Sequence, residues 1–420
     1  MNKKIFTILL TLFLSTGLYA GIFELYGVGK IGVNYSVAAQ GRGKTSVAYS
    51  DSLSYNMQNP ANLAHLKKAG IEVSVENSFN SIENVGYTNG YTGFSYGMLK
   101  FPLADKGGFA LGLTPITSSH ASYQIMMPDS SYWETASSEG NIYAATIGVA
   151  YSFFKKGQLS IGASAEYLIG GYNIVKEMDF YSPSLDAVKI ESDEGFNGWQ
   201  FTGGISFSPI KEISLGASYT HVSNTTRRQI TNYMVGSTSS DFYSHVDTVE
   251  YNNIKLFPNR FSVGLAFMPT PRYIFTLDWM QYQFGSLSSD FSFNPFYEGS
   301  QVHPFNHYGL GFERKGILSE YVPYYKSLTY RGGVYFEEQY MANSEGVPVK
   351  TYGVSLGLGL PFTEYSNRLD LAFTLEYNSG TIYEIDGINP TPINLNELVY
   401  RFNLSITIAE NWFKTRGKYR

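Results

Sequence analysis

Cysteine is absent from all 420 residues, so we expect no disulfide bond, no thiolate metal site and no lipid-modified cysteine. Charged residues are scarce, at 15% of the chain, and the acidic ones outnumber the basic ones by 35 to 30. This balance disfavours nucleic acid as a partner, because phosphate binding needs a basic surface. No run of 18 apolar residues follows residue 20, which argues against a transmembrane helix in the exported chain.

The first twenty residues, MNKKIFTILLTLFLSTGLYA, have the pattern of a secretory signal peptide. A basic start at Lys3 and Lys4 precedes a short apolar run and a small residue, Ala20, at the expected cleavage position. We therefore expect export and a mature chain that begins at Gly21. The alternative is an N-terminal anchor that stays attached.

Glycine and aromatic residues are abundant, with 42 Gly, 35 Tyr and 29 Phe. Apolar and polar residues alternate along most of the chain, as in Leu369 to Tyr377, where every second residue is apolar. This period of two is typical of β-strands with one apolar face. Fourteen such segments follow one another, at residues 69–81, 88–102, 107–118, 141–155, 158–171, 197–208, 212–224, 254–268, 272–284, 303–314, 326–338, 350–362, 367–378 and 397–409.

An even number of alternating strands predicts an all-β fold, a closed antiparallel β-barrel that spans an outer membrane. The connections favour this fold, because tight links such as 104–107 alternate with polar loops such as 172–196 and 225–253, which we expect on the outside. Rings on the apolar faces, such as Trp199 and Phe201, suit the membrane interface. The alternative is a large secreted β-sandwich or propeller, which does not account for the sorted loops.

No catalytic or cofactor motif has the context that its chemistry needs. Residues 27–32 fit G-x-G-x-x-G, but no strand of a βαβ unit precedes them. The histidines show no H-E-x-x-H spacing, and His303 and His307 could share a metal only if their strand bent sharply. We therefore predict no enzyme activity, no cofactor and no metal. Inward charges such as Glu376 and Arg401 instead indicate ion pairs in a lumen packed against a plug.

Residues 21–68 precede the first predicted strand, lack sustained alternation and include Asn59-Pro60-Ala61. We expect Asn59 to satisfy backbone groups of a loop buried in the lumen, and Pro60 to stiffen the exit towards the first strand. With the fourteen predicted strands, this segment resembles the N-terminal hatch of the long-chain fatty-acid transporter (FadL/TodX-like) family of outer-membrane proteins. In that family an Asn-Pro-Ala motif comes just before strand one of a fourteen-stranded barrel, and the N-terminal segment plugs the lumen.

The resemblance implies a hatch (21–68) and a transmembrane β-barrel (69–413), between the signal peptide (1–20) and a basic C-terminal tail (414–420) that the residues themselves indicate. It also implies passive uptake of hydrophobic molecules, long-chain fatty acids or related hydrocarbons, across the outer membrane of a Gram-negative-type bacterium. Family members bind ligand among the outer loops, then beside the hatch, and release it sideways at a kinked third strand.

Candidate ligand contacts are apolar residues at the mature N-terminus and in the predicted long loops: Phe23, Leu25, Met178, Phe180, Tyr233 and Met234. Ordinary loop packing is the alternative for each of them. Pro115 lies within the third predicted strand, where a missing N–H can open the wall. The alternative for Pro115 is that it only ends the strand.

The C-terminal sequence AENWFKTRGKYR differs from that of many barrels, which end on the aromatic residue itself. A FadL-like barrel that acts as a secretion-associated or structural scaffold is therefore the alternative function, and an open hydrophilic porin is a third. The expected partners are a hydrophobic small molecule and outer-membrane lipid, whereas nucleic acid is not expected.

Overall fold

A computed structural model describes residues 22–25, 28–31, 35–49, 51, 53, 58–82, 87–103, 106–126, 132–154, 158–182, 185–237, 240–255, 257–284, 301–319, 321–343, 345–362, 367–384 and 391–410. The predicted signal peptide and C-terminal tail lie outside the described residues. Within these ranges, no helix is both long and apolar enough to cross a membrane.

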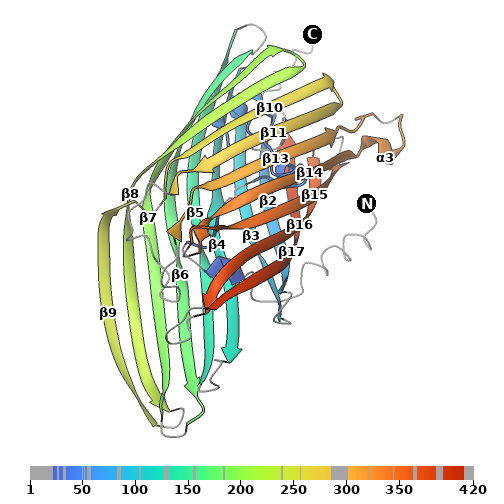
Figure 1. The fold of residues 1–420 in the computed structure, drawn as a ribbon. Helices are drawn as coiled ribbons and strands as arrows, with labels where there is room; N and C mark the ends of the chain where they lie inside the picture. Colours follow the sequence, from blue (N-terminus) through green and yellow to red (C-terminus); the bar gives the residue numbers. More distant parts are fainter. Residues whose placement is uncertain are drawn as a thin grey trace.

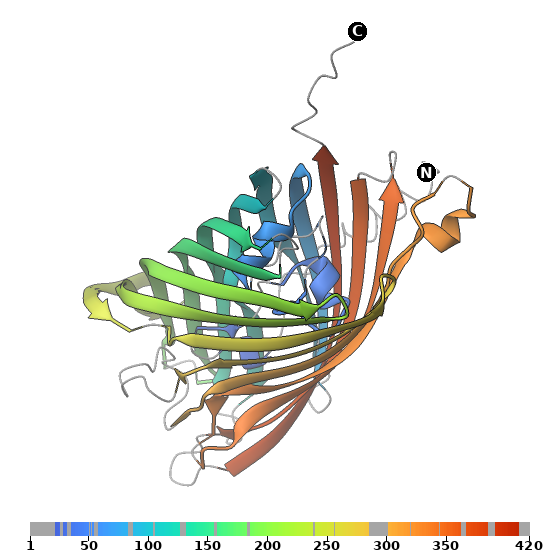
Figure 2. The same cartoon turned by 90° about the horizontal axis from the view of Figure 1, so that it is seen from above.

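Fourteen strands form a closed antiparallel β-barrel, which confirms the predicted fold class and strand number (Figures 1 and 2). The barrel closes because the last wall strand pairs with the first, from Glu397 with Ile82 to Glu410 with Ala69. The wall strands are β2 (Ala69–Ile82), β3 (Tyr87–Leu103), β4 (Gly107–Met126), β5 (Tyr132–Phe153), β6 (Leu159–Phe180), β7 (Ala187–Ile210), β8 (Ile213–Ser237), β10 (Arg260–Thr270), β11 (Tyr273–Tyr282), β13 (Phe305–Arg314), β14 (Thr329–Ala342), β15 (Pro348–Phe362), β16 (Asn367–Glu384) and β17 (Thr391–Glu410).

Seven further elements accompany the wall in the described part of the chain. Three are strands: β1 (Lys30–Ile31), β9 (Ser240–Ile254) and β12 (Gln301–Val302). Four are short helical segments: η1 (Ile22–Leu25), α2 (Val37–Gln40), η2 (Pro60–His65) and α3 (Tyr324–Ser327). Short sequences bounded by Gly, Pro or Asn cannot extend into longer helices, so helix contributes little to the fold.

An apolar band covers the outside of the barrel. In β7 the side chains of Trp199, Phe201, Ile205 and Phe207 are between 42% and 49% exposed, and they alternate with buried polar residues such as Thr202. The same alternation recurs on β5, β6, β8, β10, β11 and β13 to β17. An outward apolar face with an inward polar face is the pattern of a barrel that spans a membrane.

Strands β6, β7, β8 and β9 continue far beyond this band, as Figure 1 shows. We call this part the extension; it comprises residues 171–180, 187–197, 225–237 and 240–254. The predicted loops 172–196 and 225–253 are therefore wrong, because most of these residues are paired strands. Many of their outward side chains, such as Asp193 and Arg228, are polar, so the regular apolar alternation that marks a strand in lipid is missing.

Glycines and β-bulges mark the level at which the extension begins. Gly140 and Gly170 have φ angles of 151° and 145°, which are strained for any residue with a side chain. At the same level the ladder between β7 and β8 shifts register between Gly198 and Gln200. Such bulges bend a strand and increase its twist, and the long strands change direction here in Figure 1.

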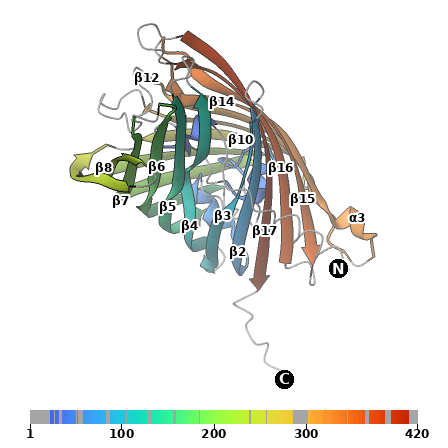
Figure 3. The same ribbon diagram turned by 90° about the horizontal axis from the view of Figure 1, so that it is seen from below.

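The N-terminal segment, residues 22–66, lies inside the ring of wall strands (Figures 2 and 3). Its described part is largely buried, and two of its helical turns, α2 and η2, contact strands of the wall. Wall glycines make this possible: a Cβ on Gly204 would lie 2.1 Å from Asn59 Oδ1, and one on Gly162 would lie 2.5 Å from the backbone of Pro60 and Ala61. Glycine at these positions lets the two backbones approach closely.

Candidate functional site: a pocket between the N-terminal segment and the wall

The Asn59-Pro60-Ala61 motif forms the start of η2 and is fully buried. Asn59 Oδ1 accepts a hydrogen bond from Ala61 N at 3.1 Å. Its amide nitrogen Nδ2 donates to the carbonyl oxygens of Val47, at 2.9 Å, and of Ile205, at 3.0 Å. Pro60 stands at the first helical position, where its missing N–H costs no bond. One asparagine thus caps a helical turn and joins the N-terminal segment to β7.

Ion pairs fix the middle of the N-terminal segment to the opposite side of the wall. Arg42 Nη1 donates to Glu313 Oε2 at 2.6 Å, and Arg331 Nε donates to the same oxygen at 2.9 Å. Arg331 Nη1 donates in turn to Asp370 Oδ1 at 2.7 Å. Asp51 Oδ2 lies 3.8 Å from Arg331 Nη2. These charges are buried, so each one needs its partner far more than a surface charge would.

Two lysines of the segment meet the carboxylates of β14 and β16. Lys44 Nζ donates to Glu337 Oε1 at 2.9 Å and to Glu376 Oε1 at 3.1 Å. Lys30 Nζ also donates to Glu376. Burial by itself lowers the pKa of Lys44, but the two carboxylates outweigh it and hold that pKa above its usual value. Lys44 is therefore charged, and it neutralises the acidic inner face of these strands.

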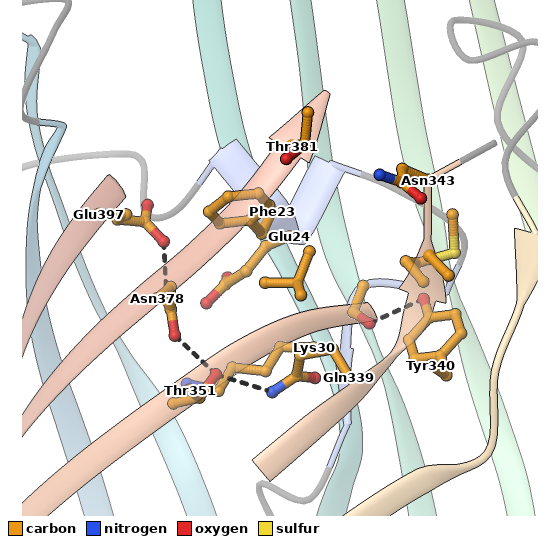
Figure 4. Close-up of a pocket in the computed structure, with 14 residues that line it drawn as sticks. Phe23, Glu24, Lys30, Gln339, Tyr340, Asn343, Thr351, Asn378, Thr381 and Glu397 are labelled. Carbon is orange, nitrogen blue, oxygen red and sulfur yellow. Dashed lines mark hydrogen bonds between the residues drawn. The ribbon is translucent and has the colours of Figure 1, made fainter. Parts of the chain in front are cut away.

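A pocket opens above these ion pairs, between the start of the N-terminal segment and the far ends of β14 to β17 (Figure 4). Its apolar lining consists of Phe23, Tyr340, Met341, Ala342 and Val349. A largely apolar lining with a few polar groups is typical of a small-molecule site.

Tyr340 fixes the floor of the pocket. Its hydroxyl donates to the carbonyl oxygen of Gly29 at 3.0 Å and accepts from the N–H of Val28 at 2.8 Å. On the same side, Glu24 Oε1 accepts from Arg401 Nη2 at 2.9 Å. Burial, with the carboxylate of Glu76 adding to it, outweighs Arg401 and raises the pKa of Glu24. The N-terminal segment is thus held on both edges of the pocket.

The polar side of the pocket is a relay of hydrogen bonds, drawn as dashed lines in Figure 4. Gln339 Nε2 donates to Thr351 Oγ1 at 3.1 Å, and that hydroxyl donates to Asn378 Oδ1 at 2.7 Å. Asn378 Nδ2 then donates to Glu397 Oε2 at 2.9 Å. The cation that lines the pocket, Lys30, is paired with Glu376. The pocket therefore offers apolar surface and acceptors, but its lysine is already neutralised.

The structure places the predicted ligand contacts in different parts of the molecule. Phe23 lines the pocket, and Leu25 lies two residues on in η1, with a side chain outside the described residues. The other four lie in the extension, on strands rather than in loops: Met178, Phe180, Tyr233 and Met234. None of these four lines the pocket.

Tyr233 and Met234 are consecutive residues of β8, so their side chains point to opposite faces of the sheet. Tyr233 is stacked on His245 of β9, with ring centroids 6.4 Å apart. Phe180 contacts Tyr132 of β5, with ring centroids 5.2 Å apart. These are contacts within the sheet, and the four residues do not form one apolar surface with Phe23.

Pro115 lies in the interior of β4 and does not end it. The ladder between β4 and β5 shifts register between Pro115 and Thr117. The ladder between β3 and β4 runs only as far as Gly97 and Leu113, among the described residues. Beyond that point β4 pairs instead with β1, through Ser118 and Thr117. A stretch of wall between β3 and β4 therefore lacks backbone pairing and is bridged by side chains.

The strongest such bridge is a ring contact. Tyr91 of β3 is stacked on His120 of β4, with ring centroids 3.8 Å apart and planes at 17°. His120 Nε2 is 3.1 Å from Asn141 Nδ2 of β5. Side-chain contacts of this kind separate more easily than a β-ladder, because no row of backbone bonds has to break together.

The sequence does not identify several of the pocket residues, notably Tyr340, Val349 and Thr381. They stand near the ends of alternating strands and look like ordinary strand residues, so no local signal separates them from their neighbours. Regarding metals, no group of three or more His, Asp or Glu in the described ranges is placed to hold an ion.

Solved structures share this fold. CymD, described as a monoaromatic hydrocarbon channel, has a TM-score of 0.62 and 14% identity, over 93% of this chain and 99% of its own. A Pseudomonas aeruginosa FadL homologue has a TM-score of 0.64 and 13% identity, over 94% of this chain and 99% of its own. The P. putida toluene transporter TodX has a TM-score of 0.61 and 16% identity, over 90% of this chain and 98% of its own.

At these identities the similarity shows the fold alone. No curated protein sequence matches the chain. The profile of the BamG family matches residues 1–419, so the chain belongs to the BamG family.

Proposed function

We propose that this protein is an outer-membrane barrel for the passive uptake of small hydrophobic molecules, with the N-terminal segment as a hatch. The observation that carries the proposal is the apolar pocket between Phe23 and Val349, because it lies where the N-terminal segment meets the wall. The apolar outer band supports a place in a membrane. The fold shared with channels described as carrying toluene and monoaromatic hydrocarbons supports the same ligand class.

The lining of the pocket favours a neutral ligand over a fatty-acid anion. A carboxylate would meet the carboxylates of Glu24 and Glu397, both of which line the pocket. The nearby cations are engaged, Lys30 with Glu376 and Arg401 with Glu24. Desolvating an anion without a free cation costs several kcal/mol. An aromatic hydrocarbon carries no charge or polar group, so it has no such desolvation cost. Long-chain fatty acids, which the resemblance also implies, are therefore the less favoured ligands.

The unpaired stretch between β3 and β4 is the proposed exit. It begins beside Pro115, and β1 of the N-terminal segment pairs with β4 there. Gly29 and Lys30 line the pocket, and Lys30 and Ile31 pair with β4, so the start of the N-terminal segment links the pocket to this stretch of wall. Release into the membrane would then require separation of Tyr91 from His120 and no broken ladder.

A pair of tryptophan substitutions on one strand tests the pocket. Val349 is 9% exposed and lines the pocket, whereas Val354 of the same strand is 52% exposed on the outer band. Val349→Trp fills the cavity, and we expect it to lower toluene uptake by roughly tenfold, since the ligand loses its apolar contacts. Val354→Trp adds the same ring on the lipid side, and uptake should stay within about twofold of the wild type.

Uptake is measured with labelled toluene, and with labelled oleate for comparison, in proteoliposomes of each variant. Equal uptake by Val349→Trp and the wild type would overturn the pocket assignment. Deletion of residues 21–30 removes Phe23, Glu24 and Lys30 together, so it should abolish saturable toluene binding to the purified barrel. Binding unchanged by that deletion would count against the role of the N-terminal segment.

A scaffold is the second candidate function, and the extension is the observation that favours it. A membrane-spanning strand needs about 9 to 11 residues, whereas β7 and β8 have 24 and 25. The excess is polar on its outer face, which suits contact with water or with other proteins. Protein partners that co-purify without hydrophobic ligand would favour the scaffold, and hydrocarbon in native mass spectra would favour the transporter.

A further inference from the structure

Strand β9 has a free edge. Over the described residues it pairs with β8 alone, from Tyr243 with Val235 to Tyr251 with Arg227 without interruption. Its continuation, β10, has two neighbours, β8 and β11. The N–H and C=O groups on the other side of β9 therefore have no strand partner there. A row of such groups is a template for another extended chain.

Three features by which proteins often protect an edge are missing from β9: a short strand, lysine and proline. β9 has fifteen residues, Ser240–Ile254, and its sequence SDFYSHVDTVEYNNI contains no lysine, arginine or proline. Val246 and Tyr251 are 56% and 40% exposed, so apolar side chains are also available for contact. This edge is open to pairing rather than blocked.

The charge of the edge indicates what kind of chain it fits. β9 carries three acidic residues, Asp241, Asp247 and Glu250. Asp247 and Glu250 are exposed and three residues apart, so they stand on opposite faces of the strand. Glu250 already lies opposite Arg228 of β8, whereas Asp247 lies opposite the uncharged Thr231. A second strand on the other side of β9 therefore gains most from a positive side chain beside Asp247, because opposite charges across a ladder stabilise the pair.

A second copy of this chain fits the edge poorly. Two β9 strands side by side would bring six carboxylates together with no lysine or arginine between them, and like charges across a ladder are destabilising. We therefore propose that the free edge of β9 binds an extended segment of another protein that carries lysine or arginine, by addition of a strand to the extension. The proposal is independent of what the pocket holds.

Synthetic peptides provide the probe. A nine-residue peptide that alternates lysine with valine should bind saturably to the detergent-solubilised full-length protein, with a Kd on the order of 100 µM or tighter. The same peptide with glutamate for lysine should bind at least about tenfold more weakly. A lysine peptide with two central prolines should not bind, because it cannot form the ladder. Fluorescence anisotropy gives the affinities, in a nonionic detergent and at fixed salt.

Two matched substitutions locate the binding. Asp247→Lys puts lysine on the edge, and we expect it to weaken binding of the lysine peptide at least about tenfold. Asp179→Lys changes the charge equally, but on β6, which pairs on both sides with β5 and β7. The affinity of the Asp179→Lys control for the lysine peptide should stay within about twofold of that of the wild type. Both residues are exposed, so neither substitution should unfold the barrel.

Hydrogen exchange shows whether a strand is added. In the free protein, fragments from β9 should exchange faster than fragments from β7, and the lysine peptide should slow exchange in β9 and leave β6 unchanged. Four results would each overturn the proposal: a β9 already protected in the free protein, equal binding of lysine and glutamate peptides, equal effects of the two substitutions, or a concentration-dependent dimer through β9. Toluene uptake by Asp247→Lys should equal that of the wild type, so failure here is distinguishable from failure of the pocket.

Discussion

Asn59 Nδ2 donates a hydrogen bond to the carbonyl oxygen of Ile205, 3.0 Å away across the boundary between the N-terminal segment and β7. The same side chain caps η2, because Asn59 Oδ1 accepts from Ala61 N, and its Nδ2 also donates to the carbonyl oxygen of Val47. Three backbone groups from three parts of the chain therefore bond to one fully buried amide.

Asn59→Ala should remove the bonds that Asn59 makes to Ala61 N and to the Ile205 carbonyl oxygen, whereas the carbonyl oxygen of Val47 keeps a bond from Asn62 Nδ2. Each buried, unsatisfied group costs about 1–3 kcal/mol, so we expect a lower unfolding temperature and a higher leak conductance in planar bilayers. Asn252→Ala, an exposed position on β9, should change neither. A bilayer as tight with Asn59→Ala as with the wild type would leave the motif unexplained.

Glu313→Ala tests the buried ion pairs. Glu313 accepts from Arg42, Arg331 and the Tyr49 hydroxyl. Its loss removes the carboxylate that pairs with the buried Arg42, while Arg331 keeps Asp370, and breaking a buried ion pair in this way costs about 3–5 kcal/mol. We expect limited proteolysis to cut the N-terminal segment much faster in this variant. Glu345→Ala removes an exposed carboxylate and is the matched control. Equal cleavage rates would show that these ion pairs do not hold the segment.

Asp51 should make the docking of the N-terminal segment sensitive to acid. Burial by itself raises the pKa of Asp51, but the guanidinium groups of Arg368 and Arg331 outweigh it and hold that pKa well below its usual value of about 3.9. A carboxyl whose pKa is lower in the folded state stabilises it fully above the unfolded pKa, and this contribution is lost as the pH falls.

The stability difference between the wild type and Asp51→Asn should therefore be constant above about pH 5 and shrink below about pH 4. Comparing the two proteins is necessary because Glu24, whose pKa burial raises, responds to acid in the opposite direction. Unfolding midpoints in urea between pH 3 and pH 7 give the difference. A difference that grows towards low pH would contradict the assigned ion pairs.

Tyr340→Phe should loosen the floor of the pocket without changing its apolar surface. The lost hydroxyl leaves the N–H of Val28 and the carbonyl of Gly29 without that partner, at about 1–3 kcal/mol for the pair. We expect faster hydrogen exchange of residues 28–31 and weaker toluene binding. Tyr377→Phe, on the outer face of β16 and 39% exposed, should alter neither measurement. Slow exchange in Tyr340→Phe would show that β1 is held by other contacts.

Pro115→Val should close part of the unpaired wall. Valine restores an N–H and favours the strand, so β4 can extend its ladder towards β3. We expect slower release of toluene into the membrane with unchanged binding to the pocket, measured by stopped-flow and equilibrium titration. Pro102→Val, within the intact ladder of β3 with Gly108, is the control. An unchanged rate of toluene release in Pro115→Val would show that the exit is not at this stretch of the wall.

The wall could be predicted from the sequence because lipid imposes a period of two on every strand that crosses it. Residues 197–208, for example, alternate visibly, and they lie within β7. Residues 187–196 of the same strand do not, because water contacts their outer face and polar residues suit it. The sequence therefore predicts loops where the extension has strands. Strands that contact lipid show a clear apolar alternation in the sequence, whereas strands with both faces in water show a much weaker one.

The site was predictable only at the N-terminal segment. Asn59 and Phe23 stand in a stretch with its own motif and position, so sequence reasoning reached them. Tyr340 and Val349 come from strands some 300 residues away, and only closure of the barrel brings them to Phe23. The sequence predicts correctly that Pro115 lies in the third strand of the wall. Only the pairing of β3 with β4 in the structure shows whether Pro115 interrupts that strand or ends it.

The ion pairs of the N-terminal segment also constrain the order of folding. Lys30 reaches Glu376, 346 residues further along the chain, and Arg42 reaches Glu313, 271 residues further. Contacts over such separations form late, because the loop between them must first be ordered. The N-terminal segment is thus among the last parts of the chain to find its partners, and until then the lumen carries exposed, uncompensated charge. Barrel closure and docking of the segment should occur as one cooperative step.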